Sequence, residues 1–428
     1  MTLAVSGVLA DPDLLFFPWD THLEEWPEEL IVALPRGISR HIVRFVRVGG
    51  VVYAIKEIEE YFARREYELL VKLGDFGIPC VEPGAVVSGR IDRNGEALPA
   101  ALVTKHLEFS LPYRAVFSST PRPDTAIRLL DALTLLFVRL HSIGFSWNDC
   151  SLSNTLFRRD AGAFAAYLVD AETGDLHSKL SDGQRTYDID TAVLNVTGEM
   201  LDLQAGGRLP ETVDPVPVGQ SLRARYERLW SLLNTPVTII NGDRRPLDSH
   251  IRRLNSMGFD VSEIDMQTVE PNKQLVTVQA KVVDAGHHAR RLIRLTGLDV
   301  EENQARRLLN DLDGFRATVA PHDEEEVVAH RWVTHVFEAV VMAVPRELRR
   351  KLEQAEVFHE VLEHRWFMSE QQGYEVPLEA AVQSYVRDVL AQKPDEKTVI
   401  LNQANADDTQ EVPVYIETAE MPAIVDED

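Results

Sequence analysis

The hydrophobic pattern of residues 51–107 predicts two strands with a helix between them. Residues 51–58, Val-Val-Tyr-Ala-Ile-Lys-Glu-Ile, form a largely apolar run that is typical of a strand. In residues 63–73 the helical period of 3.6 gathers three leucines on one face, at positions 69, 70 and 73. A second apolar run, residues 101–107, predicts another strand, which ends in polar residues.

The pattern that follows places a polar loop between a long helix and a short strand. Residues 127–144 have the composition of a buried helix, and Gly144 is suited to a left-handed C-terminal cap. Residues 166–169, Ala-Tyr-Leu-Val, predict a strand. The polar residues of the loop are therefore expected to sit on a rigid support.

Beyond residue 229 the pattern changes to well-punctuated helices with few strands. Helical stripes end or begin at recognisable caps, and they cover residues 247–254, 299–312 and 345–362. Two apolar runs, residues 237–240 and 274–283, predict strands that pair beside the helices. This part is therefore expected to be a mainly helical α+β domain.

Composition narrows the class of protein. The chain has 428 residues, a net charge of −24 and two cysteines, which argues against bulk nucleic-acid binding and against a disulfide framework. Residues 395–428 hold ten acidic residues and one basic residue without periodicity, so we expect a disordered acidic tail. No apolar run is long enough to cross a membrane and the first residues lack a cationic signal region, so the expected location is the cytoplasm.

The loop after the long helix carries the layout of a phosphotransferase catalytic loop. Asp149 is followed five residues later by Asn154, a spacing that lets one side chain take the acceptor's proton while the other holds magnesium. Asp170 ends the strand 166–169 and can ligate the same metal. The alternative is that Asp149 and Asn154 are ordinary turn and capping residues.

Lys56 on the first strand is the candidate partner of the nucleotide phosphates. Glu66 shares the apolar face of the helix 63–73, where a carboxylate needs a buried cation, so we expect it to pair with Lys56. Glu68 lies on the charged face instead, where pairing along the helix accounts for it. A lysine that only faces solvent remains the alternative.

Two further positions are candidates for binding ATP. Gly37 and Ser39 lie ahead of the lysine strand, where a loop would cover the phosphates, although a plain hairpin explains them equally well. Lys105 is one of the polar residues near the end of the strand 101–107, at the position of a hinge whose backbone would receive an adenine; an ordinary core strand is the alternative.

With these motifs, residues 30–205 resemble the protein-kinase-like superfamily, and more closely its bacterial lipopolysaccharide (Kdo/heptose) kinases and aminoglycoside phosphotransferases. The resemblance implies an α+β chain with a two-lobed kinase-like fold, ATP in the cleft, a Lys56–Glu66 ion pair, Asp149 as base, and Asn154 and Asp170 as Mg²⁺ ligands. The expected divisions are an N-lobe over 1–107, a C-lobe over 108–228, the helical domain over 229–394 and the tail over 395–428. The helical domain resembles a bacterial family without an assigned substrate.

The chain departs from the kinase pattern at two places. Trp147 and Asn148 stand where the family has His and often Arg or Gly, and Asp170 is followed by Ala-Glu rather than Phe-Gly. We therefore expect an ATP- and Mg²⁺-dependent phosphotransferase acting on a hydroxyl of a small molecule, glycan or protein, with a nucleotide-binding pseudokinase or scaffold as the alternative. The short segment after Asp170 favours a small acceptor. Asp188 or Asp190 opens the next helix, as an N-cap or as a brace for the catalytic loop.

The helical domain offers two further hypotheses. Arginine pairs recur before leucines and make a nucleic-acid-associated regulator a third alternative, although a solvated helix face explains them; the pairs begin at positions 252, 290, 306 and 349. His335 and His359 both fall on apolar helical faces and are expected to point inward. Core histidines bonded to carboxylates explain this pattern, so no metal site is assigned to them.

Overall fold

The structure is a computed structural model. It describes residues 3–7, 12–32, 34, 41–118, 125–234, 237–240, 246–247, 249–251, 260–270, 273–281 and 286–397. Gly37 and Ser39, with most of the expected acidic tail, lie outside these residues.

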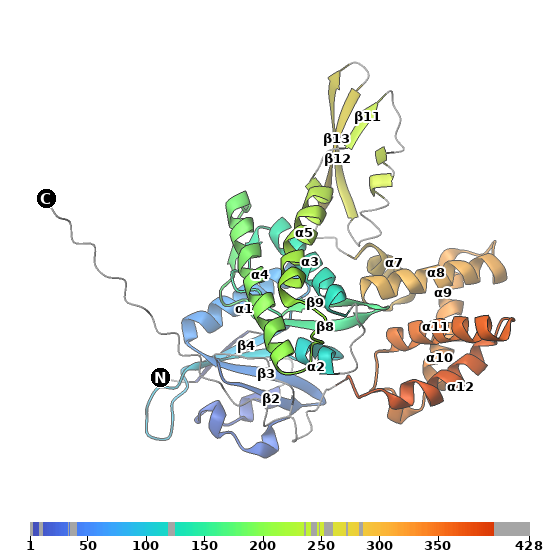
Figure 1. The fold of residues 1–428 in the computed structure, drawn as a ribbon. Helices are drawn as coiled ribbons and strands as arrows, with labels where there is room; N and C mark the ends of the chain where they lie inside the picture. The colour runs from blue at the N-terminus through green and yellow to red at the C-terminus, as the bar shows by residue number, and fades with distance from the viewer. Residues whose placement is uncertain are drawn as a thin grey trace.

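A five-stranded antiparallel sheet forms the first lobe, in the strand order β1-β4-β5-β3-β2 (Figure 1). The strands are β1 (Ala4–Gly7), β2 (Val43–Val48), β3 (Val51–Ile58), β4 (Glu82–Ser88) and β5 (Ala100–Lys105). Successive residues of a strand face opposite sides, and here both faces are covered. Helix α1 (Glu60–Asp75) packs on the face that carries Val86 and Leu102. The short helices η1 (Pro12–Phe16), η2 (Leu23–Glu25) and η3 (Glu28–Leu30) precede β2, and Leu14 and Leu23 from them pack on the other face.

The second lobe is mainly helical and contains a small antiparallel sheet of order β6-β8-β9. Its elements are β6 (Ser110–Pro112), α2 (Tyr113–Ser118), α3 (Thr125–Ser142), β7 (Phe145–Ser146), β8 (Thr155–Asp160), β9 (Ala163–Leu168), β10 (Asp175–Leu176), α4 (Asp182–Ala205) and α5 (Pro215–Asn234). Helix α3 is the expected long helix, and α5 and β9 pack against it. Together the two lobes form the expected kinase-like α+β fold.

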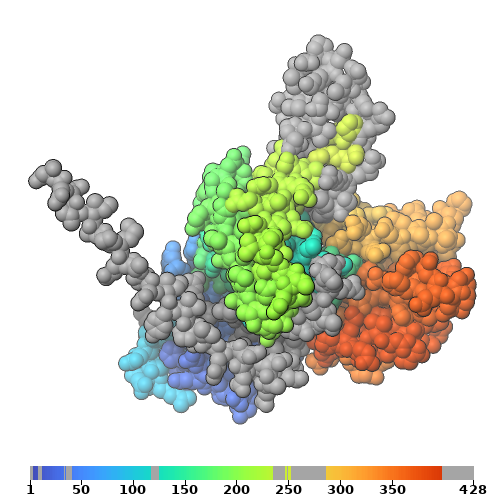
Figure 2. Space-filling model, viewed as in Figure 1, coloured from blue at the N-terminus to red at the C-terminus, as the bar shows by residue number. Residues whose placement is uncertain are grey.

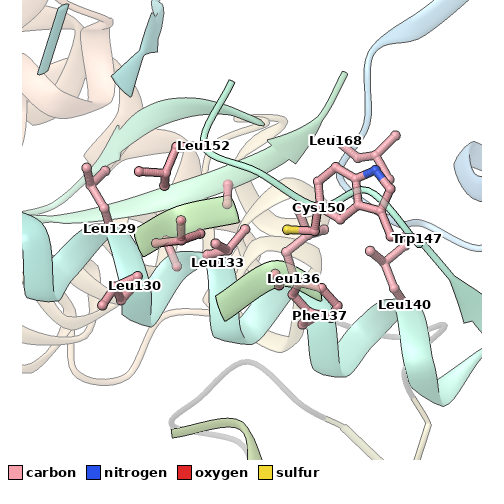
Figure 3. Close-up of a cluster of buried hydrophobic side chains, with 14 of the residues drawn as sticks. Leu129, Leu130, Leu133, Leu136, Phe137, Leu140, Trp147, Cys150, Leu152 and Leu168 are labelled. Carbon is pink, nitrogen blue, oxygen red and sulfur yellow. The ribbon is translucent and has the colours of Figure 1, made fainter. Parts of the chain in front are cut away.

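Apolar residues of the loop after α3 anchor that loop to the helix. Trp147, Cys150 and Leu152 have no exposed surface and lie against leucines of α3 (Figure 3). Because these three residues point into the core, the polar residues between them are held at the surface of the lobe. Cys150 is thus a small buried apolar residue, and burial raises the pKa of its thiol well above the usual range.

Gly144 reverses the chain after α3 and is required for space as well as for conformation. The helix ends at Ser142, two residues before the expected glycine, whose φ of +86° is in the left-handed region. A Cβ at Gly144 would lie 2.2 Å from the backbone oxygen of His177. Any side chain here would therefore push apart the loop and the segment before α4.

The remaining chain forms a three-stranded antiparallel sheet and a separate group of helices. The sheet has the order β11-β13-β12, with β11 (Val237–Ile240), β12 (Asp260–Glu270) and β13 (Lys273–Lys281). The expected pairing of the two predicted strands is confirmed, since Val237 lies opposite Val276. The helical elements are α7 (His287–Thr296), α8 (Glu302–Val319), α9 (Glu325–Trp332), the π-helical η5 (Val333–Phe337), α10 (Glu338–Ala343), η6 (Arg346–Leu348), α11 (Gln354–Gln372), α12 (Leu378–Asp388) and η7 (Leu390–Gln392). Figure 2 shows these helices, coloured orange to red, gathered into a lobe of their own.

One predicted helix is interrupted. The stripe at 345–362 predicts a single helix, but the structure has the short η6 and then α11, whose N-cap is Glu353. The Arg349 side chain donates hydrogen bonds to the carbonyls of Val344 and Met342. These bonds give partners to carbonyl groups at the C-terminal end of α10, and the chain turns there before α11 begins.

The prediction that His335 points inward is wrong, because the helix changes its period there. Val333–Phe337 is π-helical, and the extra residue per turn moves the buried position from 335 to Phe337, which is 3% exposed. His335 is consequently exposed. His359 is buried, as predicted, with 6% of its surface exposed.

The first residues of the expected acidic tail contact the kinase-like lobe. Residues 395–397 are ordered, and Glu396 is 3% exposed. Its carboxylate accepts hydrogen bonds from Arg159 in β8, the shortest 2.7 Å long. A buried ion pair therefore fixes this segment to the kinase-like lobe.

No helix among the described residues is long and apolar enough to span a membrane.

Candidate active site

Lys56 lies at the centre of a group of three carboxylates. It projects from β3, and its Nζ lies 3.0 Å from Glu66 of α1, 3.0 Å from Asp170 and 3.2 Å from Glu172. Glu66 is on the buried face of α1 with 1% of its surface exposed. Among the described residues, the three carboxylates also form the group whose oxygens are close enough together to hold a metal ion.

Burial and charge shift the pKa values of this group in the same direction for different reasons. Burial acts to lower the pKa of Lys56, but Glu66 and Asp170 outweigh it and raise that pKa. Burial, together with the charge of Asp170, raises the pKa of Glu66 to about 7 despite the adjacent lysine. Lys56 is therefore a permanent cation, and the local excess of negative charge is suited to a second cation.

The catalytic-loop candidates Asp149 and Asn154 are joined by a hydrogen bond. The Asn154 Nδ2 donates to the backbone oxygen of Asp149 at 2.9 Å, which leaves the Asn154 Oδ1 as the atom that can ligate a metal. The Asn195 Nδ2 of α4 lies 3.3 Å from the Asp149 Oδ1 and orients that carboxylate. An amide oxygen from Asn154 and a carboxylate from Asp170 are ligands that Mg²⁺ prefers, so these residues fit this ion.

The unusual Trp147 and Asn148 join the catalytic loop to the segment that carries Asp170. The Trp147 indole N–H donates to the backbone oxygen of Asp170 at 2.8 Å. The Asn148 Nδ2 donates to the backbone oxygen of Thr173 at 3.0 Å, and the Thr173 hydroxyl donates to the Trp147 oxygen at 2.9 Å. Asn148 has a φ of 64°, which asparagine tolerates better than most residues. The two residues that depart from the kinase pattern, Trp147 and Asn148, therefore connect the catalytic loop to the segment that follows Asp170.

Helix α4 supplies a set of loop contacts that sequence reasoning largely missed. Asp188 is fully buried and accepts hydrogen bonds from the backbone N–H groups of Trp147 at 2.6 Å and Asn148 at 2.7 Å. Glu199 accepts from the N–H groups of Leu152 at 2.6 Å and Ser153 at 2.9 Å. The loop's backbone is thus held at both ends by carboxylates of one helix.

Asp188 is a brace and not the N-cap of its helix. The cap of α4 is Ser181, which forms a reciprocal capping box with Gln184. Asp188 also receives a hydrogen bond from His141 of α3 at 3.0 Å, and burial lowers the pKa of that imidazole. The signal that could have identified the brace is its position: Asp188, Asn195 and Glu199 are spaced seven and four residues apart on the packed face of α4.

Lys105 lies outside the lysine-carboxylate group. It ends β5, two residues before the expected end of the strand, and lies opposite Tyr53 of β3. Its Nζ pairs with Glu82 of β4 at 3.0 Å on an exposed surface. Its side chain is therefore already paired with Glu82, and any role in nucleotide binding falls to the backbone at this position.

Glu172 is a site residue that the sequence did not identify. It bridges Lys56 and His41, whose Nε2 lies 3.0 Å from the Glu172 Oε2.

The arginine pairs of the helical domain make mostly internal contacts where they are described. Arg291 pairs with Asp313 and Glu325, Arg349 caps backbone carbonyls, and Arg350 pairs with Asp395. These contacts account for Arg291, Arg349 and Arg350 without a nucleic acid.

The sheet lobe, the buried lysine–glutamate pair and the braced Asp–Asn loop are together typical of kinase-like phosphotransferases. The comparisons with known proteins match two segments of the chain to family models. Residues 48–191 match the model of the lipopolysaccharide kinase (Kdo/WaaP) family, and residues 228–390 match the model of a domain of unknown function, DUF4032. These matches confirm the expected union of a lipopolysaccharide-kinase-type segment with a second domain.

Among solved structures, one match is "WaaP in complex with acyl carrier protein", which is 17% identical, covers 54% of this chain and all of that chain, and has a TM-score of 0.32. That score is too low to support an inference about this chain. No curated protein matches the sequence significantly.

Proposed function

We propose that this protein transfers the γ-phosphoryl group of ATP to a hydroxyl of a small molecule or glycan, with Mg²⁺ as cofactor. The observation that carries the proposal is the Lys56–Glu66–Asp170 arrangement beside a braced Asp149–Asn154 loop. Each of these side chains has a distinct task in phosphoryl transfer. The short segment from Ala171 to Ser181 favours a small acceptor over a protein.

Asp149 acts as the base. Its carboxylate takes the proton of the acceptor hydroxyl as that oxygen forms a bond to the γ-phosphorus and the bond to the β-phosphate oxygen breaks, so ADP leaves. Lys56 binds the α and β phosphates and is kept in place by Glu66. Asn154 and Asp170 would hold Mg²⁺, which neutralises phosphate charge when it is bound.

Glu172 has to leave Lys56 when phosphate arrives, and we propose that it then becomes a third metal ligand. Its carboxylate lies within metal-binding range of Asp170. A carboxylate that moves from the lysine to the metal replaces one favourable charge contact with another.

The test compares ATP turnover and thermal stability, with and without Mg²⁺, in the intact chain and its variants. Asp149→Asn is expected to lower turnover by about 10² to 10⁴ while keeping nucleotide-dependent stabilisation, because only the base is lost. Asp170→Asn is expected to lose both. Asp202→Asn, an exposed carboxylate on α4, is the matched control and should change neither.

A pseudokinase is the second candidate, and the Lys56–Glu172 contact favours it because Glu172 occupies a cation that phosphate would need. In this case nucleotide stabilises the chain, but the intact chain does not turn over ATP and Asp149→Asn therefore has no effect on turnover. If neither nucleotide nor Mg²⁺ affects the intact chain, the phosphotransferase proposal is wrong.

A further inference from the structure

The helical domain contains a cavity that is separate from the candidate active site. Its volume is about 340 Å³, within the range of small-molecule sites. It lies between α8 and α11, which run side by side in Figure 1. It is lined by Gln304, Arg307, Leu308, Ala355, Phe358, His359, Leu362, Glu363 and Trp366.

His359 is the first indication that the cavity receives a ligand. Only 6% of its surface is exposed, and its side chain forms part of the cavity wall. An imidazole ring offers both a hydrogen-bond donor and an acceptor. A polar group of a bound molecule can therefore form a hydrogen bond with it.

The charges on the cavity wall indicate what kind of molecule this is. Arg307 of α8 and Glu363 of α11 are exposed, and within the described part of the chain neither has an ion-pair partner. They do not neutralise each other, so the cavity offers one cation and one anion. Most of the remaining lining is apolar, from Leu308, Ala355, Phe358 and Leu362.

Trp366 adds an aromatic surface at the rim. It is 58% exposed although its indole lines the cavity. A large aromatic side chain in such a position can cover an apolar ligand group. Its neighbour Phe367 is exposed to a similar degree, 53%, but does not line the cavity.

We propose that the cavity binds a small zwitterion with an apolar side chain, namely an apolar α-amino acid or a close derivative. Arg307 pairs with its carboxylate, Glu363 pairs with its ammonium group, and His359 supplies a further hydrogen bond. The apolar side chain packs on Phe358 and Leu362 under Trp366.

The cavity adjoins the hairpin that follows the catalytic loop. Gln304 forms part of its wall and also donates to the backbone oxygen of Arg159 at 3.0 Å. A Cβ added at Gly162, in the turn between β8 and β9, would lie 3.9 Å from the His359 Nε2. The site is therefore formed where the helical domain meets the kinase-like lobe, so binding is measured on the full chain.

The first test is calorimetric titration of the full chain with L-leucine, L-phenylalanine and L-tryptophan, without nucleotide. At least one is expected to bind with a Kd between about 1 µM and 1 mM. For L-phenylalanine as ligand, 3-phenylpropionate lacks the ammonium group and phenethylamine lacks the carboxylate. Each analogue is expected to bind about tenfold or more weakly than the amino acid.

The second test pairs each charge with its partner group. Arg307→Gln should weaken phenylalanine binding about tenfold but leave the binding of phenethylamine, which has no carboxylate, nearly unchanged. Glu363→Gln should also weaken phenylalanine binding about tenfold, but should leave the binding of 3-phenylpropionate, which has no ammonium group, nearly unchanged. Arg346→Gln, an exposed arginine of the same domain outside the cavity, is the control for Arg307. Phe367→Ala is the control for Trp366→Ala.

Because the substituted residues are exposed, all these variants are expected to fold, and their melting curves establish this. The proposal is overturned if no amino acid binds more tightly than about 10 mM. It is also overturned if the analogues bind as tightly as phenylalanine, or if the control variants lower affinity as much as the cavity variants do. None of these outcomes depends on phosphotransferase activity.

Discussion

Trp147 shows how one residue outside the usual kinase pattern can organise the site. Its ring is fully buried against α3, and its only polar atom donates to the backbone oxygen of Asp170. The bond fixes the start of the segment whose side chain reaches Lys56. Packing and hydrogen bonding are thus combined in one side chain, and they can be separated by substitution.

Trp147→Phe keeps most of the packing but removes the indole N–H. We expect a loss of about 1 to 3 kcal/mol in the free energy of unfolding, because the Asp170 carbonyl loses its partner and the smaller ring leaves space. Any turnover should fall as Asp170 becomes less well placed. Phe137→Leu, a packing change next to Trp147, is the control: it should lower stability while leaving the turnover of folded enzyme unaltered. Chemical denaturation and ATPase assays measure both, and equal turnover in the two variants would contradict this role.

At the residue scale, the sequence identifies those site residues whose position on an element is distinctive. Glu66 could be chosen over Glu68 because a carboxylate on an apolar helix face requires a cation, and the structure brings it to 3.0 Å from Lys56. Glu172 could not be found in this way, because its contact with Lys56 depends on the path of a loop. Loop conformation is set by tertiary contacts, which have no period in the sequence.

At the scale of elements, α4 is the frame of the catalytic loop. Asp188, Asn195 and Glu199 lie on the same face as Ala192 and Val196, which are fully buried. Three polar side chains on a packed face are costly unless each has a partner, and here each binds the loop. The helix therefore determines both the position of the loop and its rigidity.

Asp188→Asn tests this frame. The amide has one acceptor oxygen in place of two, and its NH₂ group would face a backbone N–H of the loop. We expect the free energy of unfolding to fall by about 2 to 3 kcal/mol and turnover to fall with it. Asp202→Asn on the exposed face of α4 should stay within about 0.5 kcal/mol of the wild type. Thermal melting compares the two, and a stable Asp188→Asn chain would show that the brace is dispensable.

Element boundaries were predicted less well where the helical period itself changes. His335 was assigned to the core by counting with a constant period, and the π-helical turn at Val333–Phe337 invalidates that count. By contrast, His359 lies in the regular α11, and its burial follows from the period. The interruption between η6 and α11 was hidden for a similar reason, since apolar positions on both sides happen to keep one register.

At the scale of the whole molecule, the β8–β9 hairpin joins the two domains. Arg158 lies between Glu301 at 3.0 Å and Glu353 at 2.5 Å, and Arg159 pairs with Glu396. Asp160 accepts hydrogen bonds from the backbone N–H of Gln304 and the side chain of Asn303, both 2.8 Å long. Because β8 begins immediately after Asn154, the helical domain is fixed to the strand that directly follows a proposed metal ligand.

This junction gives the chain an unusual dependence on pH. Burial, together with the charge of Glu301, raises the pKa of Asp160 from 3.8 to about 7, despite its hydrogen bonds. Between about pH 4 and pH 7 the folded chain therefore binds a proton at Asp160 that the unfolded chain releases. The contribution of Asp160 to stability is accordingly most favourable below pH 4 and is lost as the pH rises through 7.

Asp160→Asn should remove this contribution. The Asn oxygen can still accept from Gln304, and Asn303 can present its carbonyl to the new amide. We expect the variant and the wild type to be alike at pH 4, and the variant to become relatively more stable toward pH 8, by up to about 4 kcal/mol. Glu66 has a similarly raised pKa but is distant in the fold, so it contributes equally to both chains and cancels in the difference. Urea denaturation of the full chain from pH 4 to 8 measures the effect, and parallel curves for the two chains would show that Asp160 stays ionised in the junction.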